Sequence, residues 1–137
     1  MGCLVLAGFL YCQTGIFGSD IIGQWREHKD RTLDSIRNSK NRQELEFLTA
    51  SPSFGNTILE FKRTVWRESV VDSGEGFDFV GSFSEYEVVA ETEDYVEIGV
   101  YVDIYDEYLT YRYHKDGSCI YLKHELRNFE SYYCRTY

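Results

Sequence analysis

Six residues near the C-terminus predict a β-hairpin in a single register. If residues 118–124 form one strand and residues 129–136 its partner, three complementary pairs face each other. The pairs are Cys119 with Cys134, Tyr121 with Tyr132, and Lys123 with Glu130. Two thiols, two aromatic rings and two opposite charges are favourable cross-strand combinations, and a slip of one residue would break all three pairs. A chain with this ending is expected to be mostly antiparallel β-sheet.

The two cysteines of this hairpin predict a disulfide. Facing positions bring their β-carbons within bridging distance, and a structural bridge belongs to an oxidising compartment. Strand alternation places both sulfurs on the face opposite Ile120 and Leu122, so the bridge is expected to lie outside the main core and to be accessible. The alternatives are a redox couple, or free thiols that behave as small buried hydrophobes in a reducing cytoplasm.

Composition favours one all-β domain with an acidic surface. The length of 137 residues leaves room for one core, and twelve Tyr and nine Phe suit pleated, half-buried surfaces. The net charge of −9 excludes a basic stripe for nucleic acid and argues against docking on anionic lipid headgroups. A basic protein partner would be attracted to such a surface.

The first twenty residues are expected to be an export signal or lipoprotein leader, and residues 21–137 the folded domain. Residues 3–12 form an uncharged apolar run that matches the central region of a signal and is too short to span a bilayer as a helix. No Lys or Arg precedes the run, and the alternative is a buried first strand.

Cys12 is the candidate lipid-bearing cysteine, although Tyr11 stands where a small residue is wanted; Cys3, after Gly2, is the other candidate. The expected location is the cell envelope or the exterior, with membrane contact only through this lipid or signal.

The rest of the chain predicts one strand, a helical insert and a long meander. Residues 21–27 form the first strand, and residues 30–50 then carry apolar residues at helical spacing. Asn41 and Glu44 resemble a capping box, which predicts a second helix after a break at residues 38–40. Further strands are expected at 56–62, 64–71, 83–91, 95–103, 107–114, 118–124 and 129–136, about eight strands in all.

Alternation assigns one face of the meander to the core. The inward residues are Tyr86, Val88, Ala90, Val96, Ile98, Val100, Val102, Leu109, Tyr111, Tyr113, Ile120 and Leu122. Asp116-Gly117 is typical of a two-residue hairpin turn. Such a turn would pair Tyr113 with Ile120 and Tyr111 with Leu122.

Several segments resemble the small bacterial lipocalin-like proteins, which are exported or lipid-anchored. Gly23-Gln24-Trp25 looks like their opening G-x-W, at the start of the first strand. The runs that share the resemblance are GQWREHKDRTLDSIRNS, FGNTILEF, YHKDGSCIYL and NFESYYCRTY. The resemblance implies an up-and-down barrel closed at one end by Trp25, with Arg135 stacked on the indole. The second and third lipocalin signatures are not recognisable, and the helical insert departs from the family.

Nothing in the sequence predicts an enzyme, a metal site or a cofactor. The histidines at 28, 114 and 124 lack metal-ligand spacing, and His114 and His124 are expected to be exposed. The acidic residues are Asp72, Glu75, Asp78, Glu91, Glu93, Asp94, Glu97, Asp103, Asp106 and Glu107. They offer oxygen ligands for Ca²⁺ but lack the alternating ligand order of a calcium loop. They can instead form an acidic face for a basic protein.

The expected function is non-enzymatic binding of a small apolar or amphipathic ligand inside the barrel. The expected ligand-binding residues are Tyr86, Ile98, Val100, Tyr111 and Tyr113, because tyrosine hydroxyls among aliphatic side chains suit a ligand with one polar end. Two alternatives remain. The same side chains can fill an eight-stranded barrel completely, and the chain can be an inhibitor or immunity protein that binds a toxin or hydrolase through an acidic and aromatic surface.

Overall fold

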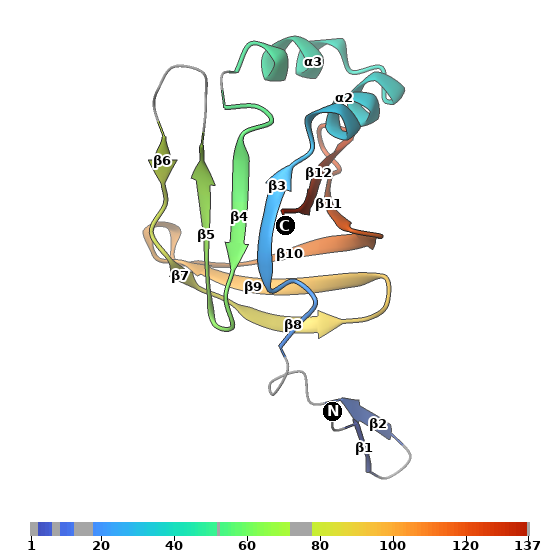
Figure 1. The fold of residues 1–137 in the computed structure, drawn as a ribbon, viewed down its shortest axis with the longest axis vertical. Coiled ribbons are helices and arrows are strands. Elements are labelled where there is room, and N and C mark those ends of the chain that lie inside the picture. The colour runs from blue at the N-terminus through green and yellow to red at the C-terminus, as the bar shows by residue number, and fades with distance from the viewer. Residues whose placement is uncertain (1–2, 7–8, 13–17, 52, 72–77, 137) are drawn as a thin grey trace.

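An antiparallel sheet with two short helices makes up the fold, as the all-β prediction requires. The computed structural model describes residues 3–6, 9–12, 18–51, 53–71 and 78–136 (Figure 1). The elements of the main body are β3 (Gly23–Glu27), α2 (Lys29–Asn38), α3 (Arg42–Thr49), β4 (Thr57–Phe61), β5 (Val65–Val70), β6 (Phe79–Val80), β7 (Ser84–Glu85), β8 (Glu87–Glu91), β9 (Tyr95–Val102), the 3-10 helix η1 (Asp103–Tyr105), β10 (Glu107–Asp116), β11 (Cys119–His124) and β12 (Phe129–Arg135).

Neighbouring strands of the main sheet follow the order β6-β5-β4-β3-β12-β11-β10-β9-β8, and β7 pairs with β5 beside this path. The first strand of the sheet, β3, therefore lies next to the last, β12. This hydrogen-bonded order ends at β6 on one side and at β8 on the other. It therefore does not show the predicted closure of the sheet into a barrel. The strand expected at 83–91 is divided at Tyr86 into β7 and β8.

Aromatic contacts show that the sheet is strongly curled. Phe61 lies on β4 and Tyr113 on β10, four strand steps apart. In a flat sheet four steps correspond to roughly 19 Å, but the two ring centroids are 5.9 Å apart. The inner face of the curl therefore encloses the core. The buried core residues are Ile21, Trp25, Leu59, Phe61, Tyr86, Val96, Ile98, Val100, Tyr113 and Ile120.

The predicted C-terminal hairpin is confirmed in its register. Cys119 pairs with Cys134, Tyr121 with Tyr132, and Lys123 with Glu130, and the two cysteines form a disulfide. The bridge is less accessible than predicted, because Cys119 is only 6% exposed. The chain that leads into β3 folds over this end of the sheet, and Cys119 lines the small pocket that Asp20 also borders.

The predicted register of the preceding hairpin is wrong by two residues. Tyr113 pairs with Leu122, and Asp116 with Cys119. The turn residues are thus Gly117 and Ser118 instead of Asp116 and Gly117, with Gly117 at φ 61°. A shift of two keeps every inward residue opposite another inward residue, so apolar pairing alone does not distinguish the two registers.

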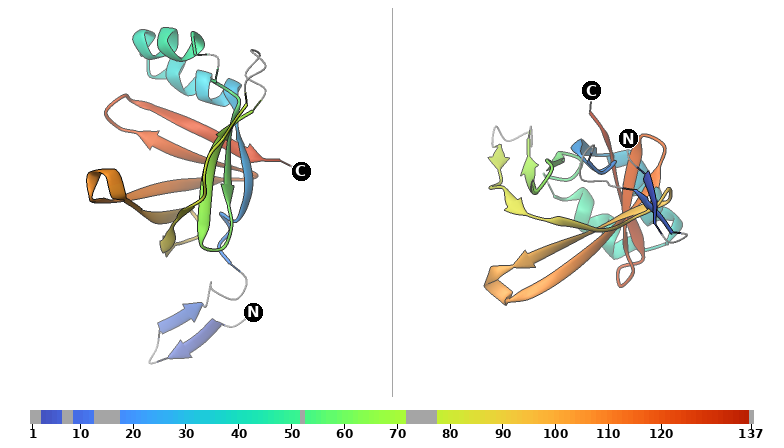
Figure 2. Two further views of the ribbon diagram at one scale, coloured as in Figure 1. Left: turned by 90° about the vertical axis from the view of Figure 1, so that its left-hand side faces the viewer. Right: turned by 90° about the horizontal axis from the view of Figure 1, so that it is seen from below.

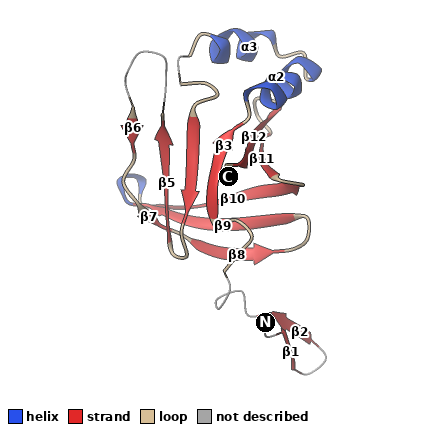
Figure 3. Cartoon of the chain, in the orientation of Figure 1, coloured by secondary structure: helices blue, strands red, loops and turns tan. Residues whose placement is uncertain are grey.

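Two helices follow β3 as predicted and lie together at one end of the sheet (Figures 2 and 3). Asn41 caps α3 by accepting a hydrogen bond from the backbone N–H of Glu44 at 3.1 Å. The hydroxyls of Thr32 and Ser35 on α2 accept hydrogen bonds from the backbone N–H groups of Tyr132 and Glu130. These N–H groups lie beyond the part of β12 that pairs with β3, so α2 satisfies donors that would otherwise be left without partners.

The N-terminal segment forms a hairpin of its own. β1 (Cys3–Leu6) and β2 (Phe9–Cys12) pair antiparallel in a separate two-stranded sheet. The predicted leader over residues 1–20 lies partly outside the described residues and stays a prediction. Within the described segments, no helix is both long and apolar enough to cross a membrane.

Removal of the Cys119–Cys134 bridge is expected to destabilise the fold. The bridge closes a loop with a sequence separation of 15, and a loop of this length corresponds to about 3 kcal/mol in the chain-entropy model. The measurement is urea unfolding of the oxidised protein and of the double variant Cys119→Ser/Cys134→Ser. Equal free energies of unfolding, with equal denaturant dependence, would show that the bridge does not stabilise the native state.

Candidate functional site

The inner face of the curled sheet brings the five predicted ligand residues together. Tyr86, Ile98, Val100 and Tyr113 belong to the buried core, and Tyr111 packs against it half-buried. The phenol ring of Tyr86 lies edge-on to Phe61, with centroids 5.4 Å apart. Tyr86 also lines a pocket of about 290 Å³ with Ile22, Thr64 and Val88.

One end of this inner face is closed by Trp25 and Arg135. The indole N–H of Trp25 donates to the carbonyl of Ile21 at 2.7 Å. The Arg135 guanidinium carbon lies 4.1 Å from the Trp25 ring centre, and the guanidinium donates to the carbonyls of Ile22, at 2.8 Å, and Asp20. The last strand is thereby joined to the chain that leads into β3.

Gly23 makes room for this contact. Its φ of +133° is rare for other residues, and a β-carbon at this position would overlap the Arg135 guanidinium. A glycine at the first position of the G-x-W motif therefore leaves room for the Arg135 guanidinium, which lies against Gly23 and stacks on Trp25.

A partly buried lysine with two carboxylate partners lies at the same end of the sheet as Trp25 and Arg135. The Lys115 ammonium lies 2.9 Å from Asp20 and 3.2 Å from Glu91. Burial opposes the charge of Lys115, but hydrogen bonds to these two carboxylates outweigh it and raise the pKa of the amine. The sequence placed Glu91 in an exposed acidic cluster, and the structure gives it a structural partner instead.

The inner face is less deeply buried away from Trp25. Val96 and Ile98 are fully buried near Trp25, whereas Leu109, Tyr111 and Leu122 are half-buried further along the strands. These three side chains occupy inner positions, because Leu109 pairs with Val100, Tyr111 with Ile98, and Leu122 with Tyr113. The apolar inner surface thus passes from fully buried to half-buried side chains along these strands.

Two carboxyl groups lie on this inner surface, and the sequence analysis missed both. Glu27 follows Trp25 by two residues on β3 and pairs with Tyr133, and Glu68 pairs with the buried Leu59. Burial raises the pKa of Glu27, and repulsion from Glu68 adds to the rise, although the Gly55 N–H donates to Glu27 at 2.7 Å. The alternation Trp25-x-Glu27 was the available signal, but acidic residues are normally assigned to the outer face.

Glu68 is both exposed and desolvated. Its side chain is accessible to solvent, yet loss of hydration raises the pKa of its carboxyl. The carboxyl of Glu68 thus reaches water while neighbouring side chains partly surround it.

Two tyrosines share the space with these carboxyls. Burial, followed by the charge of Glu68, raises the pKa of Tyr113, and burial, followed by Tyr113 and Glu27, raises the pKa of Tyr133. Groups from β3, β5, β10 and β12 therefore act on one another across the curl. We call Glu27, Glu68, Tyr113 and Tyr133 the inner acidic site.

The histidines are built into local structure. His28 caps α2 by accepting from the Arg31 N–H at 3.2 Å. His114 stacks on Tyr121, and His124 shares a hydrogen bond of 2.7 Å with Ser131. Burial lowers the pKa of both rings, so the prediction that these two histidines are exposed is wrong: aromatic stacking half-buries them.

Among the described residues, no three His, Cys, Asp or Glu side chains are grouped to hold a metal ion. Asp72 and Glu75 of the predicted acidic cluster lie outside the described residues.

No protein-family model, curated protein or solved structure matches this chain. The function is therefore argued from the geometry of the inner face.

Trp25→Ala is expected to lower the free energy of unfolding by about 3–5 kcal/mol, because it removes a fully buried aromatic ring. Arg135→Ala should cost less, and the two losses should not add, since the groups are in contact. The measurement is a double-mutant cycle by chemical denaturation.

A matched control for this cycle is Arg112→Ala combined with Trp25→Ala. Arg112 also stacks on an aromatic ring, Tyr95, at 4.1 Å, but on an exposed part of the sheet. Additive losses are expected for the control pair. Additive losses for Trp25 and Arg135 as well would mean that their stacking does not close the end of the fold.

Proposed function

We propose that this protein is a lipocalin-like barrel of the cell envelope that binds a small amphipathic ligand on its inner face. The observation that carries the proposal is the gradient along that face, from a closed aromatic end to a half-exposed apolar mouth with acidic and tyrosine groups. Ligand sites typically combine mostly apolar walls with a few convergent polar groups. We assign residues 1–20 to an export or lipoprotein leader, with Cys12 as the lipid-bearing residue.

Strand pairing around Tyr86 supports closure into a barrel. Val65 of β5 pairs with Glu85 of β7, whereas Glu87 of β8 pairs with Gly99 of β9. Between them, the Tyr86 N–H donates to the Thr64 carbonyl at 3.0 Å. The segment 84–91 thus touches both sides of the strand path. With β3 paired to β12, these contacts support a proposed circuit of β3, β4, β5, β7–β8, β9, β10, β11 and β12, equal in number to the eight strands expected from the sequence.

A completely filled barrel is the simpler alternative. In the closed half, Phe61 stacks on Trp66 with centroids 5.6 Å apart and meets Tyr86 edge-on, so aromatic rings pack against one another there. Leu109, Tyr111 and Leu122 are only half-buried. This favours a barrel that is open at the end away from Trp25, because a filled barrel would bury these side chains as fully as Ile98.

Leu109→Trp is expected to block ligand binding by filling the mouth. The probe is N-phenyl-1-naphthylamine, a neutral apolar fluorophore, titrated into the wild-type protein and the variant. Val89→Trp is the matched control, since Val89 lies on the exposed face of β8. We expect at least a tenfold weaker affinity for Leu109→Trp and little change for Val89→Trp. Equal affinities in all three proteins would place the probe outside the barrel and refute the inner site.

An inhibitor of a basic hydrolase or toxin is the second candidate, and the β9–η1–β10 hairpin is the observation that favours it. Ile104 is 88% exposed and Tyr105 is 73% exposed at its tip, beside Asp103, Asp106 and Glu107. Exposed apolar and aromatic residues of this kind mark protein interfaces, and the acidic neighbours suit a basic partner.

This candidate predicts that the protein inhibits a member of a panel of basic hydrolases and that Ile104→Ala/Tyr105→Ala abolishes the inhibition. Leu126→Ala is the control, because Leu126 is also fully exposed but lies in the β11–β12 loop. Inhibition constants decide the matter. Inhibition that survives in the tip variant, or none with any hydrolase, would exclude the hairpin as the inhibitory surface.

A further inference from the structure

We propose that the β9–η1–β10 hairpin binds an arginine-bearing segment of a partner protein, whose guanidinium groups stack on its tyrosines and pair with its carboxylates. The part of this hairpin that would make the contact is residues 99–110, which we call the hairpin arm. The inference rests on the second candidate function above and names the chemistry that the arm recognises. It is independent of the ligand site on the inner face.

One segment of the chain carries the whole acidic excess. Residues 68–111 contain thirteen Asp and Glu residues and no Lys or Arg. Since the net charge of the protein is −9, the rest of the chain has more cationic than acidic side chains. The hairpin arm lies inside the acidic segment, and its end projects beyond the neighbouring strands (Figure 2). A surface of this charge attracts a cationic partner.

Two tyrosines of the arm are held in place by carboxylates. Tyr101 and Tyr108 stand directly opposite each other on β9 and β10. The Tyr101 hydroxyl donates to Asp106, and the Tyr108 hydroxyl donates to Glu87 on β8. A β-carbon at Gly99 would overlap the Tyr108 ring, so this ring lies across β9. Tyr101 is 52% and Tyr108 is 49% exposed, and both rings therefore keep surface that a partner can contact.

Elsewhere in this chain, a ring beside a carboxylate is completed by an arginine. Tyr95 and Glu97 share one face of β9, two residues apart. The Arg112 guanidinium carbon lies 4.1 Å from the Tyr95 ring centre, and the same guanidinium donates to Glu97 at 2.9 Å. In the described part of the chain, the arginines that both lie over a ring and pair with a carboxylate are Arg31, Arg67, Arg112 and Arg127.

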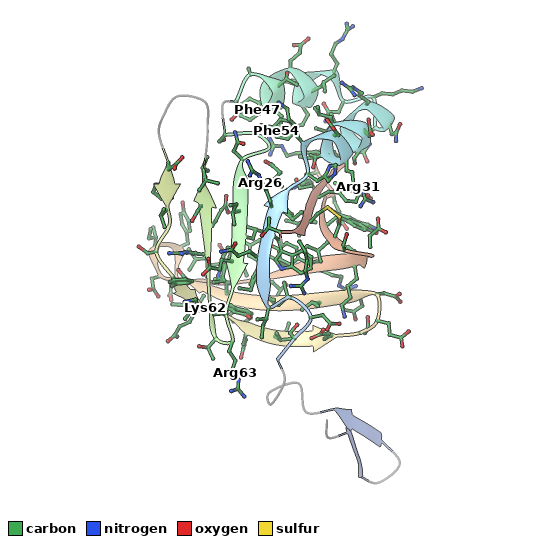
Figure 4. All side chains as sticks on the ribbon, viewed as in Figure 1. Arg26, Arg31, Phe47, Phe54, Lys62 and Arg63 are labelled. Atoms are coloured by element: carbon green, nitrogen blue, oxygen red, sulfur yellow. A yellow bond between two sulfur atoms is a disulfide. The ribbon has the colours of Figure 1, made fainter. Side chains whose placement is uncertain are left out.

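The hairpin arm has the rings and the carboxylates but no arginine. Glu87, Asp103, Asp106 and Glu107 form no ion pair with any residue that the structure describes. No described cation lies over a tyrosine ring of the arm. Arg63, at the β4–β5 turn (Figure 4), borders the same pocket as Glu87 without pairing with it. The missing guanidinium groups would come from the partner.

The chemistry of the arm favours arginine over lysine. A planar guanidinium stacks on an aromatic face while it donates to a carboxylate, whereas an ammonium is compact and strongly hydrated. A carboxylate has two oxygens, so Asp106 and Glu87 can accept from a partner while each still accepts from its tyrosine. Ile104 and Tyr105 at the tip add exposed apolar surface to the contact.

Fluorescein-labelled hexaarginine and hexalysine, two peptides of equal charge, test this selectivity by fluorescence anisotropy at low salt. We expect hexaarginine to bind the wild-type protein about fivefold more tightly than hexalysine, because only the guanidinium stacks and pairs at once. Asp103→Asn/Asp106→Asn/Glu107→Gln should weaken the binding of both peptides at least fivefold. Asn and Gln keep the shapes of the side chains and an acceptor oxygen.

A matched control removes the same charge outside the arm. Asp34→Asn/Glu46→Gln/Glu125→Gln changes three exposed carboxylates on α2, on α3 and in the β11–β12 loop. We expect little change in either affinity. Equal weakening by the arm variant and by this control would mean that the peptides respond to net charge alone, and it would overturn the arm as the binding surface.

A second variant tests the rings. Tyr101→Leu/Tyr105→Leu should abolish the preference for hexaarginine and leave the affinity for hexalysine unchanged. Both tyrosines are more than half exposed, so the substitutions spare the core. The control is Phe47→Leu, which removes a ring that is 64% exposed on α3 (Figure 4) and should leave the preference intact. An unchanged preference in the arm variant would overturn stacking on the tyrosines.

The outcomes separate this inference from the candidate function on which it rests. Equal affinities for the two peptides, or no binding of either, would overturn the arginine chemistry. If a hydrolase is nevertheless inhibited, and Ile104→Ala/Tyr105→Ala abolishes that inhibition, the inhibitory hairpin stands. Absence of both peptide binding and inhibition would overturn the candidate function together with the inference. Binding of the fluorophore on the inner face is judged separately, because none of these variants changes an inner residue.

Discussion

The contact of Arg135 with Trp25 is the interaction on which the arrangement of the sheet depends. It joins the last strand to the first, and it can form only because Gly23 leaves space for the guanidinium. The same guanidinium binds backbone carbonyls of the chain that enters β3. One cation therefore contacts both the Trp25 ring on β3 and the chain that leads into this strand, next to the β3–β12 pairing.

Asymmetry between the two ends follows from this arrangement. Charges at the closed end are matched inside the chain, with Lys115 between Asp20 and Glu91. Elsewhere on the inner face, Glu27 and Glu68 form no ion pair with a described residue, and burial raises the pKa of both carboxyls.

The C-terminal hairpin was predictable because three pairs of different chemistry, a thiol pair, an aromatic pair and a charged pair, all require the same register. The β10–β11 register was predicted wrongly for a related reason: apolar residues on both strands remain paired after a shift of two. Helix spacing and the Asn41 cap located both helices. The two-residue strand β6 is too short to leave a periodic signal. Alternation located the five residues predicted to bind a ligand on the inner face, but it did not locate Glu27 and Glu68 there, since a charged residue in a strand normally indicates the solvent side.

The helical insert supplies hydrogen-bond acceptors to the sheet where strand pairing ends. β3 leaves the sheet after Glu27, so β12 loses its neighbour beyond Tyr133. Hydroxyls of Thr32 and Ser35 take over the N–H groups of Tyr132 and Glu130, and Arg31 lies over the Tyr132 ring at 4.4 Å. Helix α2 thus supplies the hydrogen-bond acceptors that a longer β3 would have provided to β12. Because β3 ends at Glu27, this carboxyl lies at the end of a strand and is only half-buried, whereas an isolated carboxylate deep in the core would be far more costly.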